Sequence, residues 1–387
     1  MTWLPQWRIT VGTTVYDNVQ SVNLTIGRVD IDRQCQAGYA RMDIVNTGST
    51  PFDIDVTDSL KLEVKDSSGT YVDVFGGIVS DFSISVRSPE ESGFLTVGSV
   101  LAVGNLAKLP KAIWTGSLTQ DLDGVQIAEI FDSLASLETG ELDAGRYEMV
   151  SRNADPIVMS DIVTLIADSG IGQLYEDKLG RVCFADADHR SVYLNANGYK
   201  ELDANYASPS SIKSILQIGK IRNSLTAEYD NNYSQTLTDE DAASVAIYGL
   251  YSRKFRSTIK HTADMEDLFT RELALRSVPK TQLDSITFRL DNPNMPDSLR
   301  DELLNIFFGE PVLLTNLPTN IINGEFGGFV EGWTITATPS RVDLKIYASP
   351  VEFSIVPPQW ETVSPDTLIW NDVNATLTWQ DANGALV

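Results

Sequence analysis

The sequence predicts an α+β protein that is mainly β, with two strand-rich domains, a small α/β domain between them and a short C-terminal β extension. Three observations predict this class. Apolar and polar residues alternate through residues 1–118 and again from about residue 211, whereas residues 119–210 show helical spacing. A chain of 387 residues exceeds the usual size of one compact core. Its 42% of hydrophobic residues is enough to build more than one core.

The first domain, residues 1–118, is predicted to consist of strands. Turns rich in Gly, Asn and Ser separate segments in which every second residue is apolar. The clearest segments are residues 21–26, 59–64 and 81–86. Strands at this spacing predict a β-barrel or a sandwich.

Residues 119–210 are predicted to form the small α/β domain. A first helix carries apolar residues at helical spacing from Ile127 to Leu137, and a second helix follows Pro156. Two apolar strands joined by a Gly-containing turn then occupy residues 172–184, which predicts a hairpin.

Residues 211–355 are predicted to form the second strand-rich domain. Three helices interrupt the alternation: one begins near Asp239, one ends at Pro279 and one ends at Gly309. The alternating segments are residues 224–229, 285–290 and 333–338.

The C-terminal extension, residues 356–387, carries a tandem repeat. The pattern Leu-x-Trp-(Asn or Gln)-Asp-x-Asn begins at Leu368 and again at Leu377. Two interpretations stay open: a terminal hairpin whose tryptophans pack on the body, or an arm that docks on a neighbouring subunit by adding strands.

The net charge of −24 comes from 53 acidic residues against 29 Lys and Arg. Such a surface repels phosphate groups, which excludes a reader of nucleic acid and disfavours binding to an anionic membrane. Residues 119–210 alone hold 17 acidic and 6 basic residues. These acids form either a solvated face or a functional surface that faces other anions.

Cellular location is constrained by what the sequence lacks. The N-terminal residues show no signal-peptide pattern, and no apolar run approaches the roughly 18 residues of a spanning helix, so we expect a soluble protein. Cys35 and Cys183 are far apart and form no metal knuckle or disulfide framework. We expect two buried thiols in a protein that folds in a reducing cytoplasm.

Catalytic patterns are not found. His189 and His261 come without a Gly-x-Ser-x-Gly elbow. Asp186, Asp188 and His189 offer ligand atoms, but their spacing matches no zinc or calcium site and favours a polar loop. We therefore assign no catalytic, cofactor-binding or metal-binding residue and expect no enzyme.

Two further runs receive structural interpretations. The glycine-rich residues 324–332 lack the Lys-Ser or Lys-Thr of a phosphate loop, and we expect their glycines to serve turns and close backbone approach. The basic residues 253–256, with Lys260, form either a solvated strand face or a contact to an acidic neighbouring copy. A β-rich acidic chain without catalytic equipment indicates binding or assembly.

Several stretches resemble minor tail proteins of long-tailed bacteriophages. Residues 7–11, 36–40 and 75–81, followed by residues 106–110, are similar to the N-terminal part of those proteins. The order of these short motifs along the chain is more specific than any one of them.

The middle domain resembles the hub proteins of phage baseplates and of type VI secretion spikes. Their pattern Gly-x-x-Tyr-x-Asp-x-x-Gly-Arg-x-x-Phe corresponds, with local shifts, to Gly172, Tyr175, Asp177, Gly180, Arg181 and Phe184. Residues 241–249 are similar to the Ser-x-x-x-Tyr-Gly element of hubs, and residues 309–314 and 329–333 to their closing strands. The resemblance covers most of residues 1–350.

The resemblance implies two tail-tube-like β-barrels with a small α/β domain inserted between them. It implies a homotrimer whose six barrels match a sixfold tail tube to a threefold tip, located at the tail tip or baseplate of a virion and made in the host cytoplasm. The implied partners are further copies of the chain, the tail tube or distal tail protein, and tail-tip or fibre proteins. DNA would pass through the lumen without specific binding, because an acidic wall repels phosphates.

Two other functions remain as alternatives. Trp360, Trp370 and Trp379 would stack on pyranose rings if the protein binds a host-surface sugar at the tail tip. The third reading is a carboxylate-based cell-wall hydrolase, for which the 53 acids supply no distinctive pair.

Overall fold

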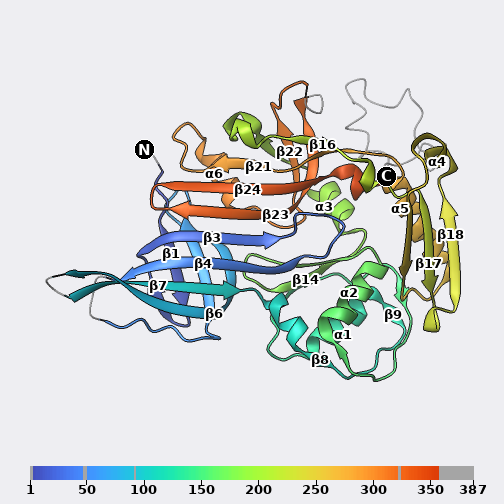
Figure 1. Ribbon diagram of the computed structural model, residues 1–387, viewed down its shortest axis with the longest axis horizontal. Helices are drawn as coiled ribbons and strands as arrows, with labels where there is room; N and C mark the ends of the chain where they lie inside the picture. The colour runs from blue at the N-terminus through green and yellow to red at the C-terminus, as the bar shows by residue number, and fades with distance from the viewer. Residues whose placement is uncertain (1–2, 47–49, 91–92, 321–323, 357–387) are drawn as a thin grey trace.

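The computed structural model describes residues 3–46, 50–90, 93–320 and 324–356. Its largest element is a twelve-stranded sheet whose long strands run along the long axis of the molecule (Figure 1). Six α-helices and five smaller sheets in the described residues complete the fold. The predicted mainly β, α+β class is confirmed. The Trp repeat lies outside the described residues.

The large sheet combines strands from distant parts of the chain. All of its pairs are antiparallel except the parallel pair of β15 with β22, and β24 (Arg341–Pro350) joins it by pairing with β23 and with β21 (Ile286–Arg289). The other strands follow the order β15 (Lys200–Asp203), β22 (Pro311–Thr315), β23 (Phe326–Thr338), β3 (Val19–Gly27), β4 (Gln36–Asn46), β7 (Gly93–Val103), β6 (Tyr71–Glu90), β5 (Ser59–Lys65), β1 (Trp7–Val11) and β2 (Thr14–Tyr16).

The two strand-rich regions of the sequence meet in this sheet. Strand β23 pairs with β3, so that Trp333 lies opposite Ile26 and Ile335 opposite Leu24. In the described residues, the large sheet runs from β15 at one edge to β2 at the other and does not close into a barrel. The two predicted barrels are therefore not confirmed. Alternation specifies which side chains face inward, but not which strand edges pair.

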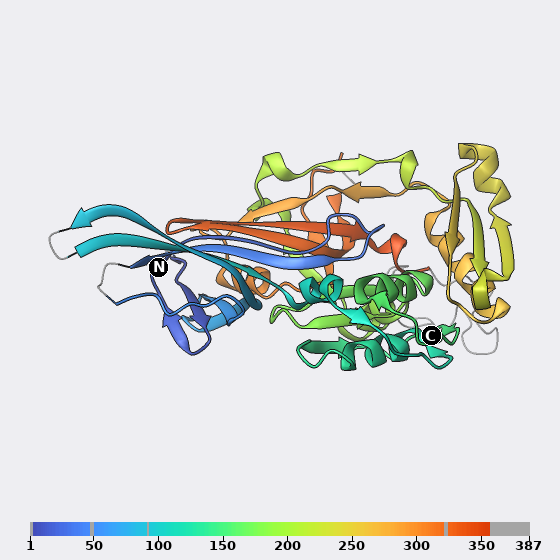
Figure 2. The ribbon, with the colours of Figure 1, turned by 60° about the horizontal axis from the view of Figure 1, so that its bottom comes forward.

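Most of the smaller sheets lie toward the end of the molecule opposite the N-terminus (Figures 1 and 2). The sheets are β10 (Thr139–Leu142), β14 (Val182–Ala185) and β13 (Gln173–Glu176); β18 (Gln235–Glu240), β17 (Ser224–Tyr229) and β19 (Ser252–Arg256); β16 (Ser214–Leu216) with β20 (Thr281–Leu283); β9 (Asp121–Leu122) with β11 (Glu148–Met149); and β8 (Ile113–Trp114) with β12 (Ile157–Val158). The helices are α1 (Asp123–Asp132), α2 (Met159–Ser169), α3 (His189–Asn197), α4 (Ala242–Tyr248), α5 (Thr262–Arg276) and α6 (Asp297–Leu304). Helices α1, α2, α4 and α5 lie toward the same end as most of the smaller sheets, whereas α6 lies over the large sheet (Figures 1 and 2). Among the α-helices of the described residues, only α6 contributes buried side chains to the core of the large sheet.

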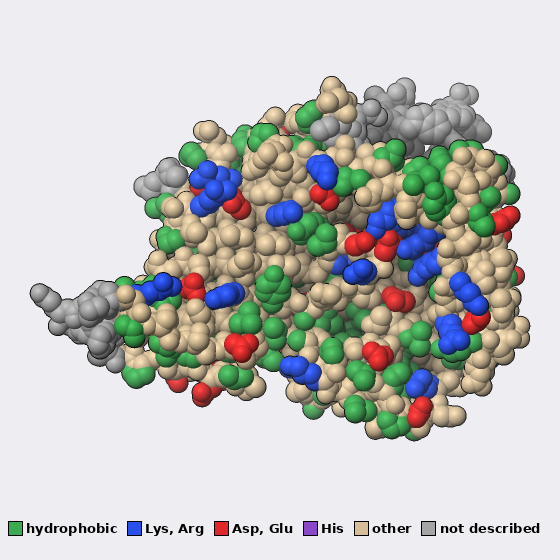
Figure 3. All heavy atoms as spheres, in the orientation of Figure 1, with side chains coloured by type: hydrophobic (Ala, Val, Ile, Leu, Met, Phe, Trp, Pro, Cys, Tyr) green, Lys and Arg blue, Asp and Glu red, His purple; other side chains and the backbone are tan. Residues whose placement is uncertain are grey.

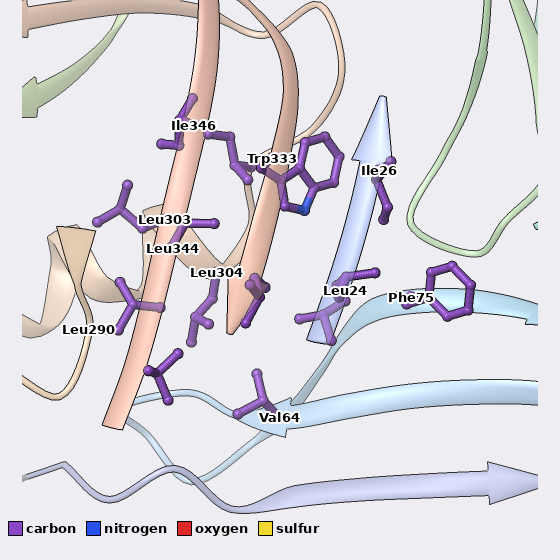
Figure 4. Close-up of a cluster of buried hydrophobic side chains, with 14 of the residues drawn as sticks. Leu24, Ile26, Val64, Phe75, Leu290, Leu303, Leu304, Trp333, Leu344 and Ile346 are labelled. Atoms are coloured by element: carbon purple, nitrogen blue, oxygen red, sulfur yellow. The ribbon is translucent and has the colours of Figure 1, made fainter. Parts of the chain in front are cut away.

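One hydrophobic core lies against the large sheet. Figure 4 shows Leu24 and Phe75 from the first strand-rich region beside Trp333 and Leu344 from the second. All four side chains are at most 2% exposed. Because burial of apolar surface contributes roughly 25 cal/mol per Å², these contacts bind the two regions into one folded body.

A second core joins the predicted middle domain to part of the second strand-rich region. Ile127 of α1 and Ile166 of α2 share it with Leu225 of β17 and Phe269 of α5. Residues 211–355 thus contribute to both cores. Each core therefore combines residues from more than one of the domains that we predicted along the chain.

Most predicted helices form. Helix α2 and the β13–β14 hairpin match the sequence pattern, and α1 ends at Asp132, before Leu137. Helix α6 ends at Leu304, earlier than the predicted end at Gly309. Helix α3 was not predicted, because the residue that it buries is Arg190 and not an apolar stripe.

In the described residues, no helix is long and apolar enough to cross a membrane.

Candidate functional site: the projecting hairpin and the charged junction

Strands β6 and β7 form a long hairpin that projects beyond the body of the molecule (Figures 1 and 2). The two strands pair from Ile78 opposite Val103 to Glu90 opposite Gly93, with register shifts between Val79 and Asp81 and between Val86 and Ser88. Near the body, Phe82 packs edge-on against Phe52, with ring centroids 5.6 Å apart. Farther out on the same side of β6, Ile84 and Val86 are 56% and 61% exposed. The hairpin thus carries apolar side chains beyond the reach of either core.

The glycine-rich run supplies close backbone contacts, as the sequence predicts. Gly27 and Gly332 lie opposite each other where β3 meets β23. A Cβ atom on Gly27 would lie 2.4 Å from the Glu331 carbonyl oxygen, and its φ of +84° disfavours any other residue. A Cβ on Gly332 would lie 2.6 Å from the carbonyl oxygen of Ile26. These glycines let the two strand-rich regions join.

A β-bulge at this joint turns Glu331 into the protein. The pairing of β23 with β24 shifts register between Val330 and Gly332, which is how a bulge re-aims a side chain. The Glu331 carboxylate accepts hydrogen bonds from Arg28 Nε at 2.7 Å and from Arg190 Nη1 and Nη2 at 2.7 and 3.0 Å. The Ser349 hydroxyl also donates to it. Burial alone would raise the pKa of Glu331, but the charges of Arg190 and Arg28 outweigh it and hold that pKa well below its usual range.

A second ionic cluster lies beside the first. Asp32 accepts from Arg222 at 2.5 Å and from Lys220 at 2.8 Å. Arg222 also donates to the buried Glu272 of α5 at 2.6 Å, and Arg253 of β19 donates to the same oxygen at 3.2 Å. Figure 3 shows basic and acidic side chains gathered in this part of the surface. The two clusters together link the first strand-rich region, the helical region and the second strand-rich region.

The polar loop and its histidine take part in local contacts. Asp186 Oδ1 accepts from the backbone N–H groups of Asp188 and His189 at 2.8 and 2.9 Å. Asp188 pairs with Arg271 at 2.7 Å. His189 Nδ1 lies 2.9 Å from Asp143 Oδ2, and this hydrogen bond raises the pKa of His189 above its ordinary value.

One group of possible metal ligands occurs in the described residues. Ligand atoms of Glu141, Asp143 and His189 lie within 4.8 Å of one another. Asp186 and Asp188 are not in this group, so the run that we weighed from the sequence is not brought together as a ligand set.

The basic run is paired within the chain. Lys254 and Arg256 both contact Glu228 of β17, at 2.5 and 3.2 Å, and Lys260 contacts Asp230 at 2.6 Å. Both Lys254 and Arg256 remain 65% exposed, which matches the solvated strand face.

Of the two thiols, Cys183 is buried and Cys35 is half-buried, and both are free. Burial raises the pKa of Cys183 to about 11 and that of Cys35 to about 12. Both are therefore protonated and unreactive near neutral pH.

Sequence reasoning missed the buried ionic residues Arg28, Arg190 and Glu331. A signal existed for one of them: Glu331 stands in an apolar strand, between Val330 and Trp333, where a charge needs a partner. Nothing in the sequence points to the two arginines as those partners, because they lie 303 and 141 residues away.

Over most of its length, the chain has a fold similar to that of solved tail proteins. The 43 kDa tail protein of prophage MuSo2 from Shewanella oneidensis aligns with a TM-score of 0.59 at 11% identity, over 91% of this chain and 100% of that one. The tail protein from Neisseria meningitidis MC58 aligns with a TM-score of 0.61 at 10% identity, over 91% and 98%. The prophage tail protein gp18 from Listeria monocytogenes EGD-e aligns with a TM-score of 0.51 at 11% identity, over 88% and 94%.

The chain has a phage tail-protein fold. The resemblance that the sequence motifs indicate is confirmed at the level of the fold. No protein-family profile and no curated protein matches the sequence. The similarity in fold extends over nearly the whole length of these neighbours.

Proposed function

We propose that this protein is a structural hub of a phage tail, which joins the tail tube to the tail tip or baseplate. The observation that carries the proposal is the similarity in fold to tail proteins over 91% of this chain. The proposed state is a homotrimer in the virion, in contact with the tube or distal tail protein on one side and with tip or fibre proteins on the other. We also propose that residues 1–118 and 211–355 correspond to two tube-like barrel domains, with residues 119–210 inserted between them.

The hairpin β6–β7 is proposed as the contact between copies in the ring. Ile84 and Val86 are more than half exposed in the single chain, although they continue the side of β6 on which Phe82 packs. A neighbouring copy would cover them, because contiguous exposed apolar side chains usually mark an interface. The second copy is the occupant because a ring of identical chains needs a repeated contact.

The most detailed part of the proposal is that the assembled copies line the channel through which the genome passes. The net charge of −24 suits a lumen through which DNA slides, since like charges prevent tight binding. Seventeen of the 53 acids lie in residues 119–210, so the proposal requires part of that segment to face the lumen. No enzymatic step is proposed.

The test of assembly is the mass of the purified protein by native mass spectrometry, with negative-stain images of the same sample, alone and with tube protein. We expect a threefold ring for the wild type. The double variant Ile84→Asp, Val86→Asp is expected to remain folded and monomeric. Ile247→Asp on α4, where the wild-type side chain is 72% exposed, is the matched control and should still form rings.

The outcomes separate the parts of the proposal. A wild type that stays monomeric both alone and with tube protein contradicts the hub. Rings formed by the double variant would leave the hub intact and exclude the hairpin as the contact.

A further inference from the structure

A cavity of about 90 Å³ lies at the charged junction between the two cores. Its wall combines the segment after β3, the end of α2, the start of α3, the side of α5 and residues 353–354. Seven arginines and four acidic residues line it. A local excess of basic side chains is unusual in a chain with a net charge of −24.

Three buried arginines of this wall have N–H groups without a partner among the described residues. They are Arg28 Nη2, Arg190 Nε and Arg276 Nη1. Arg28, Arg190 and Arg276 are 8%, 3% and 5% exposed. A buried donor without an acceptor costs about 1–3 kcal/mol, and more when it is charged. All three residues line the cavity, so an acceptor bound there would lie beside them. The Arg28 and Arg190 guanidiniums also lie over the Phe308 ring, 5.6 and 5.5 Å from its centroid.

Three acids of the junction, Asp32, Glu272 and Glu331, already accept hydrogen bonds from other donors. Both oxygens of Glu331 accept from Arg28 and Arg190 through other nitrogens. Oε1 of Glu272 accepts from two arginines, and both oxygens of Asp32 bind basic side chains.

Arg276 is the least neutralised of the three. Its nearest acidic atom is Asp32 Oδ1, at 3.5 Å, and its guanidinium lies over the Phe353 ring, 4.1 Å from the centroid. Burial lowers the pKa of Arg276 even though Glu272 and Asp32 are near.

We propose that this cavity binds a small tetrahedral oxyanion of the size and charge of inorganic phosphate. Guanidinium groups present paired N–H donors that match such an ion. The cavity volume of about 90 Å³ is well above the roughly 10–15 Å³ of accessible space that one water needs. The bound ion would neutralise Arg276 and join the two cores, and it would stabilise the folded chain in proportion to its concentration.

The experiment titrates sodium phosphate into the full-length protein by isothermal calorimetry, with ionic strength held constant by sodium chloride, and records the melting temperature in parallel. Sulfate should replace phosphate, whereas acetate should not. We expect saturable binding to one site per chain and a melting temperature that rises with phosphate concentration.

Three variants locate the site. Arg276→Met should weaken phosphate binding at least about tenfold. Arg253→Gln, at the rim of the cavity, should weaken phosphate binding several-fold. Because the Arg253 side chain is 36% exposed, this variant should fold and test the site even if Arg276→Met does not fold. Arg289→Gln removes an exposed arginine that contacts Asp291 and does not line the cavity, and should bind as the wild type does.

The proposal is overturned if phosphate at about 10 mM gives neither heat nor stabilisation. It is also overturned if acetate acts as phosphate does, or if Arg289→Gln weakens binding as much as Arg253→Gln. None of these measurements depends on the assembly of the ring, so this proposal and the hub can fail separately.

Discussion

The Arg190 guanidinium donates to both carboxylate oxygens of Glu331, at 2.7 and 3.0 Å, across 141 residues of the chain. Arg190 belongs to the short helix α3 and Glu331 to the bulge in β23. Both side chains are nearly inaccessible, at 4% and 2% exposure. Since Arg28 on the first strand-rich region binds the same carboxylate, one acidic residue ties three parts of the chain together.

Glu331→Gln is expected to destabilise the protein strongly. The variant removes the carboxylate that pairs directly with the buried Arg28 and Arg190. Removal of one partner from a buried ion pair typically costs about 3–5 kcal/mol. The free energy of unfolding, measured in urea, is the readout. Glu325→Gln, at an exposed position on the same segment, is the control and should change it by less than about 0.5 kcal/mol. A loss below about 1 kcal/mol for Glu331→Gln would show that the ionic cluster does not hold the joint.

Gly76→Ala is expected to disturb the packing of the β13–β14 turn on the large sheet. A Cβ atom on Gly76 would lie 2.1 Å from the carbonyl oxygen of Leu179, which is a backbone atom and can move only with the whole turn. We expect a loss of roughly 1–3 kcal/mol, as for overpacked positions. Gly219→Ala is the matched control, because a Cβ there would meet nothing within 4 Å. Equal stability of the two variants in thermal unfolding would refute the close contact.

Asp123→Asn is expected to change how stability depends on pH. Burial raises the pKa of the Asp123 carboxyl to about 7, although the backbone N–H groups of Arg146 and Tyr147 favour its charged form. In the unfolded chain an Asp titrates near 3.9. The folded state therefore binds the proton more tightly, and its stability should fall by up to about 4 kcal/mol as the pH rises from about 4 to about 7.

The measurement for Asp123 is the difference in unfolding free energy between Asp123→Asn and the wild type at several pH values. We expect the variant to gain relative stability from pH 4 to pH 7 and to show a constant difference above that range. Glu176, whose pKa burial also raises to about 7, is present in both proteins and cancels in the comparison. A difference that does not vary with pH would mean that Asp123 titrates normally.

Most elements of the fold were predictable from the sequence, but helix α3 was not. Alternation around Leu24 and Ile335 places both side chains inward, and helical spacing from Met159 onward predicts α2. Which strands pair with each other was not predictable. Alternation of apolar and polar residues determines which face of the sheet each side chain occupies, but not which strand lies next to it. The pairing of Trp333 with Ile26 joins regions that the sequence pattern treats as separate domains.

The candidate site was predictable only in part. The glycines near residue 332 were correctly interpreted as close backbone contacts, and exposed Lys254 and Arg256 as a solvated strand face. The arginines around the cavity were not found, since single charged residues in strands and helices are common on surfaces. Their significance comes from burial and convergence, which only the three-dimensional fold shows.

The central claim is that this chain forms the hub between the tail tube and the tip. Electron microscopy of virions that carry a gold label on this protein tests the claim most directly. The account predicts label at a single position, where the tube meets the tip or baseplate. Label spread along the tail tube, or absent from intact virions, would contradict it.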